Sequence, residues 1–254
     1  MKPRLLVSVI AGVTACSSLW ADLASTIAKV KPSVVIVGSY NDTHSPRFRL
    51  RGTGFVVGNG NMVITNAHVL EQPGPVEAGS ILVTQVRLES DKVQMRKSTV
   101  LQLDPVHDLA LLSLEGPAVP ALTVGDSDAV QEGQSVAFTG FPIGGVLGFS
   151  PVTHRGVVSS IAAVALPAPT AAHLNEKSIR SLRDASGFNV FQLDGTAYPG
   201  NSGGPLFEPE TGEVLGVVNM VFVKGTRESA LTNPSGISYA IPARFVLELL
   251  QRTP

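Results

Sequence analysis

Short runs of β-branched and other apolar residues, each closed by glycine, proline or a polar turn, recur along most of the chain. Runs of this length and composition are typical of β-strands. The 254 residues include 25 glycines and 18 prolines, and only 15% are charged, which favours many strands and turns over long helices. The sequence therefore predicts an all-β protein. Strands are expected at 33–39, 47–51, 62–70, 81–88, 93–103, 109–114, 135–141, 152–161, 188–194, 205–207, 214–223 and 237–241.

The segment 200–206, Gly-Asn-Ser-Gly-Gly-Pro-Leu, places one serine among three glycines. Glycine accepts backbone conformations that other residues resist, so this loop can expose the Ser202 hydroxyl. The loop can also direct the N–H groups of Gly200 and Ser202 at one point, where a carbonyl oxygen would become negative. The alternative interpretation is a glycine-rich hairpin connection with an incidental serine.

A serine hydroxyl needs a base before it can act as a nucleophile. Of the five histidines, only His68 ends an apolar strand pattern, where an imidazole would be held rigidly. Asp108 precedes a buried apolar run and would be costly to bury without a partner, so it is the predicted carboxylate beside the imidazole. The alternatives are a surface or core-edge histidine and a turn or strand-capping aspartate. The rival residues are His44, His107, His154, His173, Asp104, Asp126, Asp128 and Asp194.

In the order His68, Asp108, Ser202, these segments resemble the chymotrypsin-fold serine proteases, and most closely the bacterial HtrA/Deg type. The resemblance covers about residues 22–250. It includes the segments 52–57, 124–128, 140–144, 156–159 and 236–242, such as Gly-Thr-Gly-Phe-Val-Val and Gly-Phe-Pro-Ile-Gly. It implies two packed six-stranded antiparallel Greek-key barrels, at about 33–115 and 130–241, joined by a crossing segment at 115–125.

The same resemblance implies a serine endopeptidase that cleaves polypeptides through a triad of His68, Asp108 and Ser202. Gly200, Asn201 and Ser202 would form the oxyanion hole, with Asn201 supplying the turn. The wall of the primary specificity pocket would come from Thr196, Ala197, Tyr198, Val218, Asn219 and Met220.

Two further expectations concern specificity and activation. Thr196 stands where trypsin-like enzymes carry an acid, so cleavage after small or medium apolar residues is expected. Asn201 is neutral and cannot pair with a newly formed amino terminus. Activation by N-terminal insertion is therefore not expected.

Other functions remain as alternatives. A protease-fold envelope protein could bind polypeptides without cutting them or be a latent enzyme, and an esterase would use the same chemistry. The esterase interpretation is disfavoured because the serine loop leads into a strand instead of a helix. The glycines at 52–54 lack the spacing of a dinucleotide loop, so no cofactor or metal is expected. The formal charge of −1 gives no reason to expect nucleic-acid binding.

The first 21 residues are predicted to be an export signal, with Lys2 and Arg4 before an apolar centre. Cys16 is the only cysteine. It ends a Val-Thr-Ala-Cys segment similar to a lipoprotein lipobox, and the alternative is cleavage after Ala21. Both interpretations predict a bacterial periplasmic protein, with membrane attachment only through a lipid on Cys16. A monomer and a trimer both remain open.

Helices are expected at 22–30 and 242–252. The segment 162–187 interrupts the strand pattern, includes a possible helix at 175–185, and is expected to act as a regulatory loop. Many HtrA relatives carry a C-terminal PDZ domain, and the chain is expected to lack one.

Overall fold

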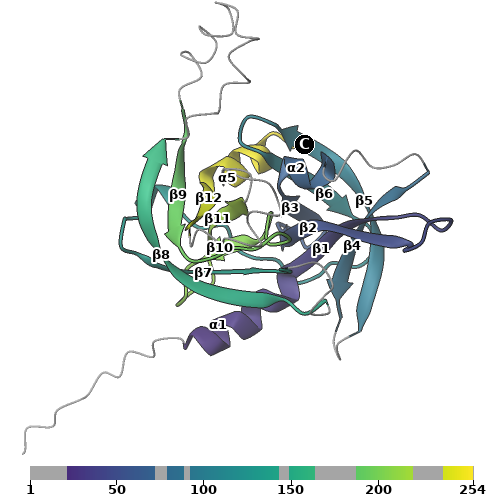
Figure 1. Cartoon of the computed structure of the whole chain (residues 1–254), viewed down its shortest axis with the longest axis horizontal. Helices are drawn as coiled ribbons and strands as arrows, with labels where there is room; N and C mark the ends of the chain where they lie inside the picture. Colours follow the sequence, from purple (N-terminus) through teal and green to yellow (C-terminus); the bar gives the residue numbers. More distant parts are fainter. Residues whose placement is uncertain are drawn as a thin grey trace, which may run out of the picture.

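The computed structural model of the protein describes residues 22–71, 79–88, 92–142, 149–163, 187–219 and 237–253. Within these residues the strands form two closed six-stranded barrels that lie side by side (Figure 1). Each barrel is built from antiparallel pairs, so the predicted two-barrel, all-β architecture is confirmed.

Barrel one has the strand order β1-β2-β3-β6-β5-β4. Its strands are β1 (Val34–Tyr40), β2 (Phe48–Val57), β3 (Met62–Thr65), β4 (Ile81–Arg87), β5 (Val93–Asp104) and β6 (Leu109–Leu114). Barrel two has the order β10-β11-β12-β9-β8-β7. Its strands are β7 (Ser135–Gly140), β8 (Val152–Ala163), β9 (Asn189–Asp194), β10 (Pro205–Phe207), β11 (Val214–Asn219) and β12 (Ile237–Pro242).

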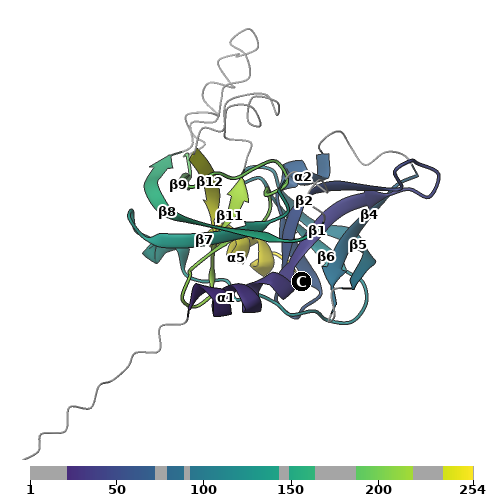
Figure 2. The same cartoon turned by 60° about the horizontal axis from the view of Figure 1, so that its bottom comes forward.

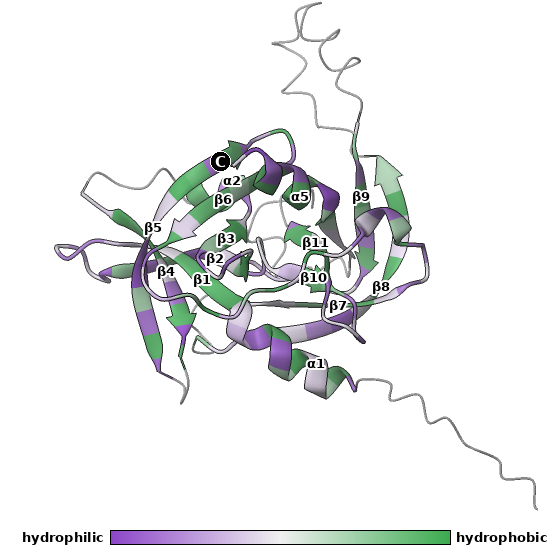
Figure 3. Cartoon of the chain, turned by 180° about the vertical axis from the view of Figure 1, so that it is seen from behind, coloured by the Kyte–Doolittle hydropathy of each residue, from purple (hydrophilic) through white to green (hydrophobic). Residues whose placement is uncertain are grey.

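Three α-helices accompany the barrels in the described part of the chain. Helix α1 (Leu23–Val30) has apolar Leu23 and Val30 on the side that packs against β1 and β7, while Ser25 and Lys29 are exposed (Figures 2 and 3). Helix α2 (Ala67–Glu71) follows β3, and helix α5 (Arg244–Gln251) follows β12. None of these helices has the length and apolar composition needed to cross a bilayer.

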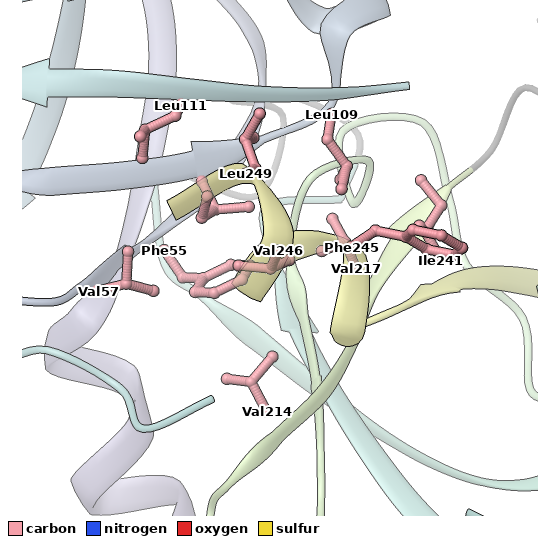
Figure 4. Close-up of a cluster of buried hydrophobic side chains, with 11 residues drawn as sticks. Phe55, Val57, Leu109, Leu111, Val214, Val217, Ile241, Phe245, Val246 and Leu249 are labelled. Atoms are coloured by element: carbon pink, nitrogen blue, oxygen red, sulfur yellow. The ribbon is translucent and has the colours of Figure 1, made fainter. Parts of the chain in front are cut away.

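The two barrels share a hydrophobic core that helix α5 closes. Barrel one contributes Phe55, Leu109 and Leu111 to this core, and barrel two contributes Val217 and Ile241. Phe245, Val246 and Leu249 of α5 pack between them (Figure 4). Burial of this apolar surface fixes how the barrels sit against one another, which decides how residues on different barrels meet.

Three local expectations differ from the structure. The strand expected at 62–70 ends at Thr65 and gives way to helix α2. The C-terminal helix begins at Arg244, because Pro242 still belongs to β12. The alternating arginines of 47–51 predict an edge strand with solvated side chains, but Arg51 is buried and its Nη1 donates to the Leu70 carbonyl at 2.8 Å.

Several expectations fall outside the described residues. They are the export signal with Cys16, the helix at 175–185, nearly all of the regulatory segment 162–187, and Met220.

Candidate active site

His68 lies in the first turn of helix α2, shortly after strand β3 of barrel one ends at Thr65. The peptide N–H of Ala67 and the Asn66 side chain both donate to the Asp108 carbonyl, at 3.1 and 3.0 Å. At the other end of the helix, the buried Arg51 guanidinium satisfies the Leu70 carbonyl. Both ends of α2 are thus hydrogen-bonded to barrel one, which restricts the position of the His68 imidazole.

Asp108 ends the turn between β5 and β6 and has a positive φ of 52°. This left-handed conformation is uncommon for a residue with a side chain, although aspartate tolerates it better than most. The conformation is accompanied by two hydrogen bonds from His68. The peptide N–H donates to Oδ1 at 2.8 Å, and ring Nδ1 donates to Oδ2 at 2.6 Å. A carboxylate in this place holds the tautomer that leaves Nε2 free to accept a proton.

Asn219 donates to the same Asp108 oxygen that accepts from the His68 ring. Its Nδ2 donates to Asp108 Oδ2 at 2.6 Å, and its side chain is fully buried. The two residues are 111 positions apart, and the bond joins the end of β11 in barrel two to barrel one. Asn219 was expected to line the specificity pocket, and the structure gives its side chain this different place.

A second imidazole–carboxylate pair closes the turn that carries Asp108. Asp104 accepts hydrogen bonds from the peptide N–H of His107 at 3.2 Å and from its Nδ1 at 2.9 Å. The His107 ring stacks on Phe245 of α5 with 3.8 Å between centroids, and Arg252 Nη1 lies 3.5 Å from Asp104. Burial alone would raise the pKa of the Asp104 carboxyl. The hydrogen bonds and charge of His107, with the charge of Arg252, outweigh it and hold that pKa below 3.8.

The serine loop connects β9 to β10 of barrel two. Gly200 and Gly203 have φ values of 104° and 86°, which favour glycine. A Cβ on Gly203 would overlap the Thr53 carbonyl oxygen and the Thr65 hydroxyl, so the loop lies directly against barrel one. Ser202, in the same loop, is buried, with 6% of its surface exposed.

The backbone N–H groups of the loop fall into two sets. Those of Asn201, Gly203 and Gly204 donate to Tyr198, Val218 and Asn201 carbonyls at 2.9–3.0 Å. Within the described part of the chain, the N–H groups of Gly200 and Ser202 make no hydrogen bond. Two unengaged donors that flank one residue can serve an incoming oxygen, whereas the Asn201 N–H is already occupied.

Gly52 of β2 lies next to both helix α2 and the serine loop. A Cβ on Gly52 would lie 2.7 Å from Val69 Cγ2 and 3.0 Å from the Ser202 carbonyl oxygen, so the residue after His68 and the backbone of Ser202 approach the same point of barrel one. No hydrogen bond joins the Ser202 hydroxyl to the imidazole among the residues that the structure describes. Catalytic hydrogen bonds are often long in unliganded enzymes and shorten when substrate binds.

The expected pocket wall divides into buried and partly exposed residues. Ala197 and Val218 belong to the core of barrel two, and the Ala197 N–H donates to Ser238 Oγ at 2.7 Å. Thr196 and Tyr198 keep part of their surface exposed. Met220 lies beyond the described residues.

Tyr198 lies near His154, one of the rival candidates for the base. The His154 ring stacks on Phe138 at a centroid distance of 4.9 Å and lies 6.3 Å from the Tyr198 ring. Its Nε2 is buried without a hydrogen-bond partner, and burial lowers the pKa of the imidazole below 6.5. Grouped histidine, cysteine and acidic side chains with the arrangement of a metal site do not occur among the described residues.

Comparison with known proteins gives three consistent findings. Residues 52–217 match the family described as "Trypsin-like peptidase domain". The chain is 30% identical over 201 residues to a "Probable periplasmic serine endoprotease DegP-like" of Marinomonas sp. (strain MWYL1), covering 79% of this chain and 35% of the relative. It is 33% identical over 217 residues to a protein of the same description from Chlamydia muridarum (strain MoPn / Nigg), covering 84% and 36%. The chain thus spans about a third of the length of these relatives.

Solved structures show the same fold. "HtrA-type protease AlgW with tripeptide" superposes with a TM-score of 0.65 at 23% identity, covering 91% of this chain and 62% of that one. "HtrA-type protease AlgW with decapeptide" gives a TM-score of 0.65 at 21% identity, with coverages of 91% and 67%.

Proposed function

The chain belongs to the family of trypsin-like peptidase domains, and from this premise we propose that it is a serine endopeptidase. His68, Asp108 and Ser202 form the proposed triad. The proposal rests above all on the partly buried hydrogen-bond chain from Asn219 through Asp108 to His68, together with a serine loop that has two unengaged N–H groups. A carboxylate–imidazole pair next to a serine is the arrangement that activates a hydroxyl for attack on a carbonyl.

In the proposed mechanism Ser202 Oγ bonds to the carbonyl carbon of a peptide while its proton passes to His68 Nε2. The carbonyl electron pair moves onto oxygen, where the N–H groups of Gly200 and Ser202 stabilise it. Collapse of this intermediate breaks the C–N bond, and His68 returns its proton to the leaving nitrogen. Water then attacks the acyl-enzyme in the same way, which releases the acid and restores the serine.

A fluorophosphonate probe tests the proposal directly, because it reacts only with an activated serine. We expect labelling of Ser202 in the wild-type protein and no labelling in Ser202→Ala or His68→Ala. Peptide turnover should fall by about 10⁶ in either variant. Labelling that persists in His68→Ala would contradict the assignment of the base.

The alternative function is polypeptide binding without cleavage. It predicts that a properly folded wild-type protein binds unfolded casein without cleaving it and does not react with the fluorophosphonate probe. Casein hydrolysis compared with p-nitrophenyl acetate turnover further separates an endopeptidase from an esterase.

We propose that the enzyme cleaves after small or medium apolar residues. Thr196 and Tyr198 contribute side chains to the proposed pocket, and Ala197 and Val218 contribute backbone, since their side chains are buried. None of these residues offers a negative charge to a lysine or arginine substrate. Profiling with a peptide library tests this, and dominant cleavage after arginine or lysine would refute it.

The two curated relatives compared above are described as periplasmic, and we propose the same compartment for this protein. Its substrates would be envelope or misfolded polypeptides. Intact mass spectrometry of the native protein distinguishes a lipid-bearing Cys16 from a chain that begins at Asp22.

A further inference from the structure

Thr53 is a fully buried residue of β2 that contacts the serine loop with both its backbone and its side chain. Its N–H donates to the Ser202 carbonyl at 2.9 Å. Its hydroxyl donates to the Gly200 carbonyl at 2.6 Å and accepts from the Phe141 N–H at 3.0 Å. Its own carbonyl accepts from the Thr65 hydroxyl at 2.7 Å. Every polar group of this residue is therefore engaged: its N–H and hydroxyl bond to segments of barrel two, and its carbonyl bonds within barrel one.

These contacts fix the carbonyls of the two residues whose N–H groups are unengaged. Gly200 has a positive φ and no side chain, so the loop has wide torsional freedom at this point. A peptide group is planar, so anchoring the Gly200 and Ser202 carbonyls fixes the peptide planes that follow these two residues. The Ser202 N–H lies in the plane between these two, whose Asn201 carbonyl accepts from the Gly204 N–H at 3.0 Å. The Gly200 N–H lies in the plane just before them, so the anchors leave it only the rotation about the Gly200 Cα.

The loop obtains little of this restraint from its own polar side chain. Asn201 is fully buried, yet neither its Oδ1 nor its Nδ2 has a hydrogen-bond partner. A Cβ on Gly140 would lie 2.7 Å from Asn201 Oδ1 and 3.1 Å from Thr53 Oγ1, so the hydroxyl occupies a tightly packed space beside the unpartnered amide. The hydroxyl of Thr53 is the side-chain group that holds the Gly200 carbonyl.

We propose that Thr53 is a positioning residue for the oxyanion hole and that it acts through its hydroxyl. This inference rests on the proposed endopeptidase function. Loss of the hydroxyl leaves the Gly200 carbonyl and the Phe141 N–H buried without a partner, which favours rearrangement of the loop. The consequence is weaker stabilisation of the transition state with little effect on substrate binding.

The test compares Thr53→Val with Thr53→Ser and with the matched control Thr84→Val. Valine keeps the shape of threonine and removes the hydroxyl, while serine keeps the hydroxyl. Thr84 is also fully buried in barrel one, and its hydroxyl bonds to Ser98 Oγ at 2.7 Å. Each protein is assayed for kcat and KM on one peptide, for inhibition by a peptide boronic acid, and for its free energy of unfolding.

We expect Thr53→Val to lower kcat by about 10²–10³, the effect of losing an oxyanion donor, with KM nearly unchanged. Inhibition by the boronic acid should weaken in parallel, because that inhibitor places a negative oxygen in the hole. Thr53→Ser should keep the wild-type kcat, and Thr84→Val should lose stability without losing kcat. If Thr53→Val does not fold, Thr53→Cys replaces it, since a thiol is a weak donor.

Wild-type kcat in a folded Thr53→Val or Thr53→Cys protein would overturn this inference but not the proposed function. An equal loss of kcat in Thr84→Val would also overturn it, because the effect would then be general destabilisation. A wild-type protein that neither cleaves peptides nor reacts with fluorophosphonate would overturn the proposed function and this inference together.

Discussion

The hydrogen bond from Asn219 to Asp108 offers a quantitative test of how barrel two supports the proposed catalytic residues of barrel one. Asn219→Leu keeps the approximate volume of the side chain and removes the donor. The lost bond is 2.6 Å long, fully buried on the Asn219 side, and made to a carboxylate. Hydrogen bonds to charged groups contribute about 1.5–3 kcal/mol.

Each 1.36 kcal/mol of transition-state stabilisation is a factor of about ten in rate, so kcat/KM should fall by about 10- to 150-fold. This range lies below the loss of about 10⁴ that follows when a triad acid itself is altered. The reduction should appear mainly in kcat, because Asp108 acts on the imidazolium that forms during the reaction. The rate constant for fluorophosphonate labelling of Ser202 should fall in parallel.

A matched control separates this effect from general destabilisation. Asn61→Leu removes hydrogen bonds from Asn61 Nδ2 to the Leu114 and Gly116 carbonyls, at 3.0 and 2.8 Å, within barrel one. It should lower the free energy of unfolding and leave kcat/KM at the wild-type value. A folded Asn219→Leu protein with wild-type kcat/KM would refute the view that this bond positions Asp108.

Four other predictions concern the loop, the response to acid and the core between the barrels. Gly203→Ala should abolish labelling of Ser202, because the added Cβ would overlap the Thr53 carbonyl and the conformation at φ 86° disfavours alanine by about 1–2 kcal/mol; labelling at the wild-type rate would contradict this. Burial lowers the pKa of His154 in the folded state, so on acidification the unfolded chain binds a proton before the folded protein does. The free energy of unfolding should therefore decrease as the pH falls below 6.5. His154→Phe should reduce this decrease in urea titrations at about pH 5 and 8. The lowered pKa of Asp104 contributes stability that is present above pH 3.8 and is lost as the pH falls through the pKa of the folded state. Asp104→Asn should therefore reduce the loss of unfolding free energy in urea titrations below pH 3.8. Phe245→Ala should cost about 3–5 kcal/mol of unfolding free energy, since the ring fills the core between the barrels and stacks on His107, and an unchanged denaturation midpoint would contradict that role.

The residue patterns were sufficient to predict an all-β protein, and the resemblance to the chymotrypsin-fold proteases predicted the two barrels. Strand periodicity and turn residues are local signals, and the segments around His68, Asp108 and Ser202 each carry their own pattern. The helix at His68 was missed because the apolar run from Met62 to Leu70 suits a strand until long-range contacts intervene. Those contacts are hydrogen bonds to the Asp108 backbone, about 40 residues away, and to Arg51, about 20 residues away.

The supporting residues could not be found in the same way. Asn219 lies 111 residues from Asp108, and Thr53 lies 147 residues from Gly200. Nothing in the local pattern around either residue distinguishes a buried donor from a side chain on a pocket wall. The one available signal was a polar residue at a core position in an apolar strand, which implies a partner without identifying it.

The division of the reacting groups between the barrels has a consequence for control of the protein. His68 and Asp108 belong to barrel one, whereas Ser202 and Asn219 belong to barrel two, and α5 packs between the two bodies. If Ser202 and His68 act as proposed, a small rotation of one barrel against the other would separate nucleophile from base, and Asn219 from Asp108, at the same time. A ligand that displaces α5 would then inhibit turnover without contacting the proposed triad.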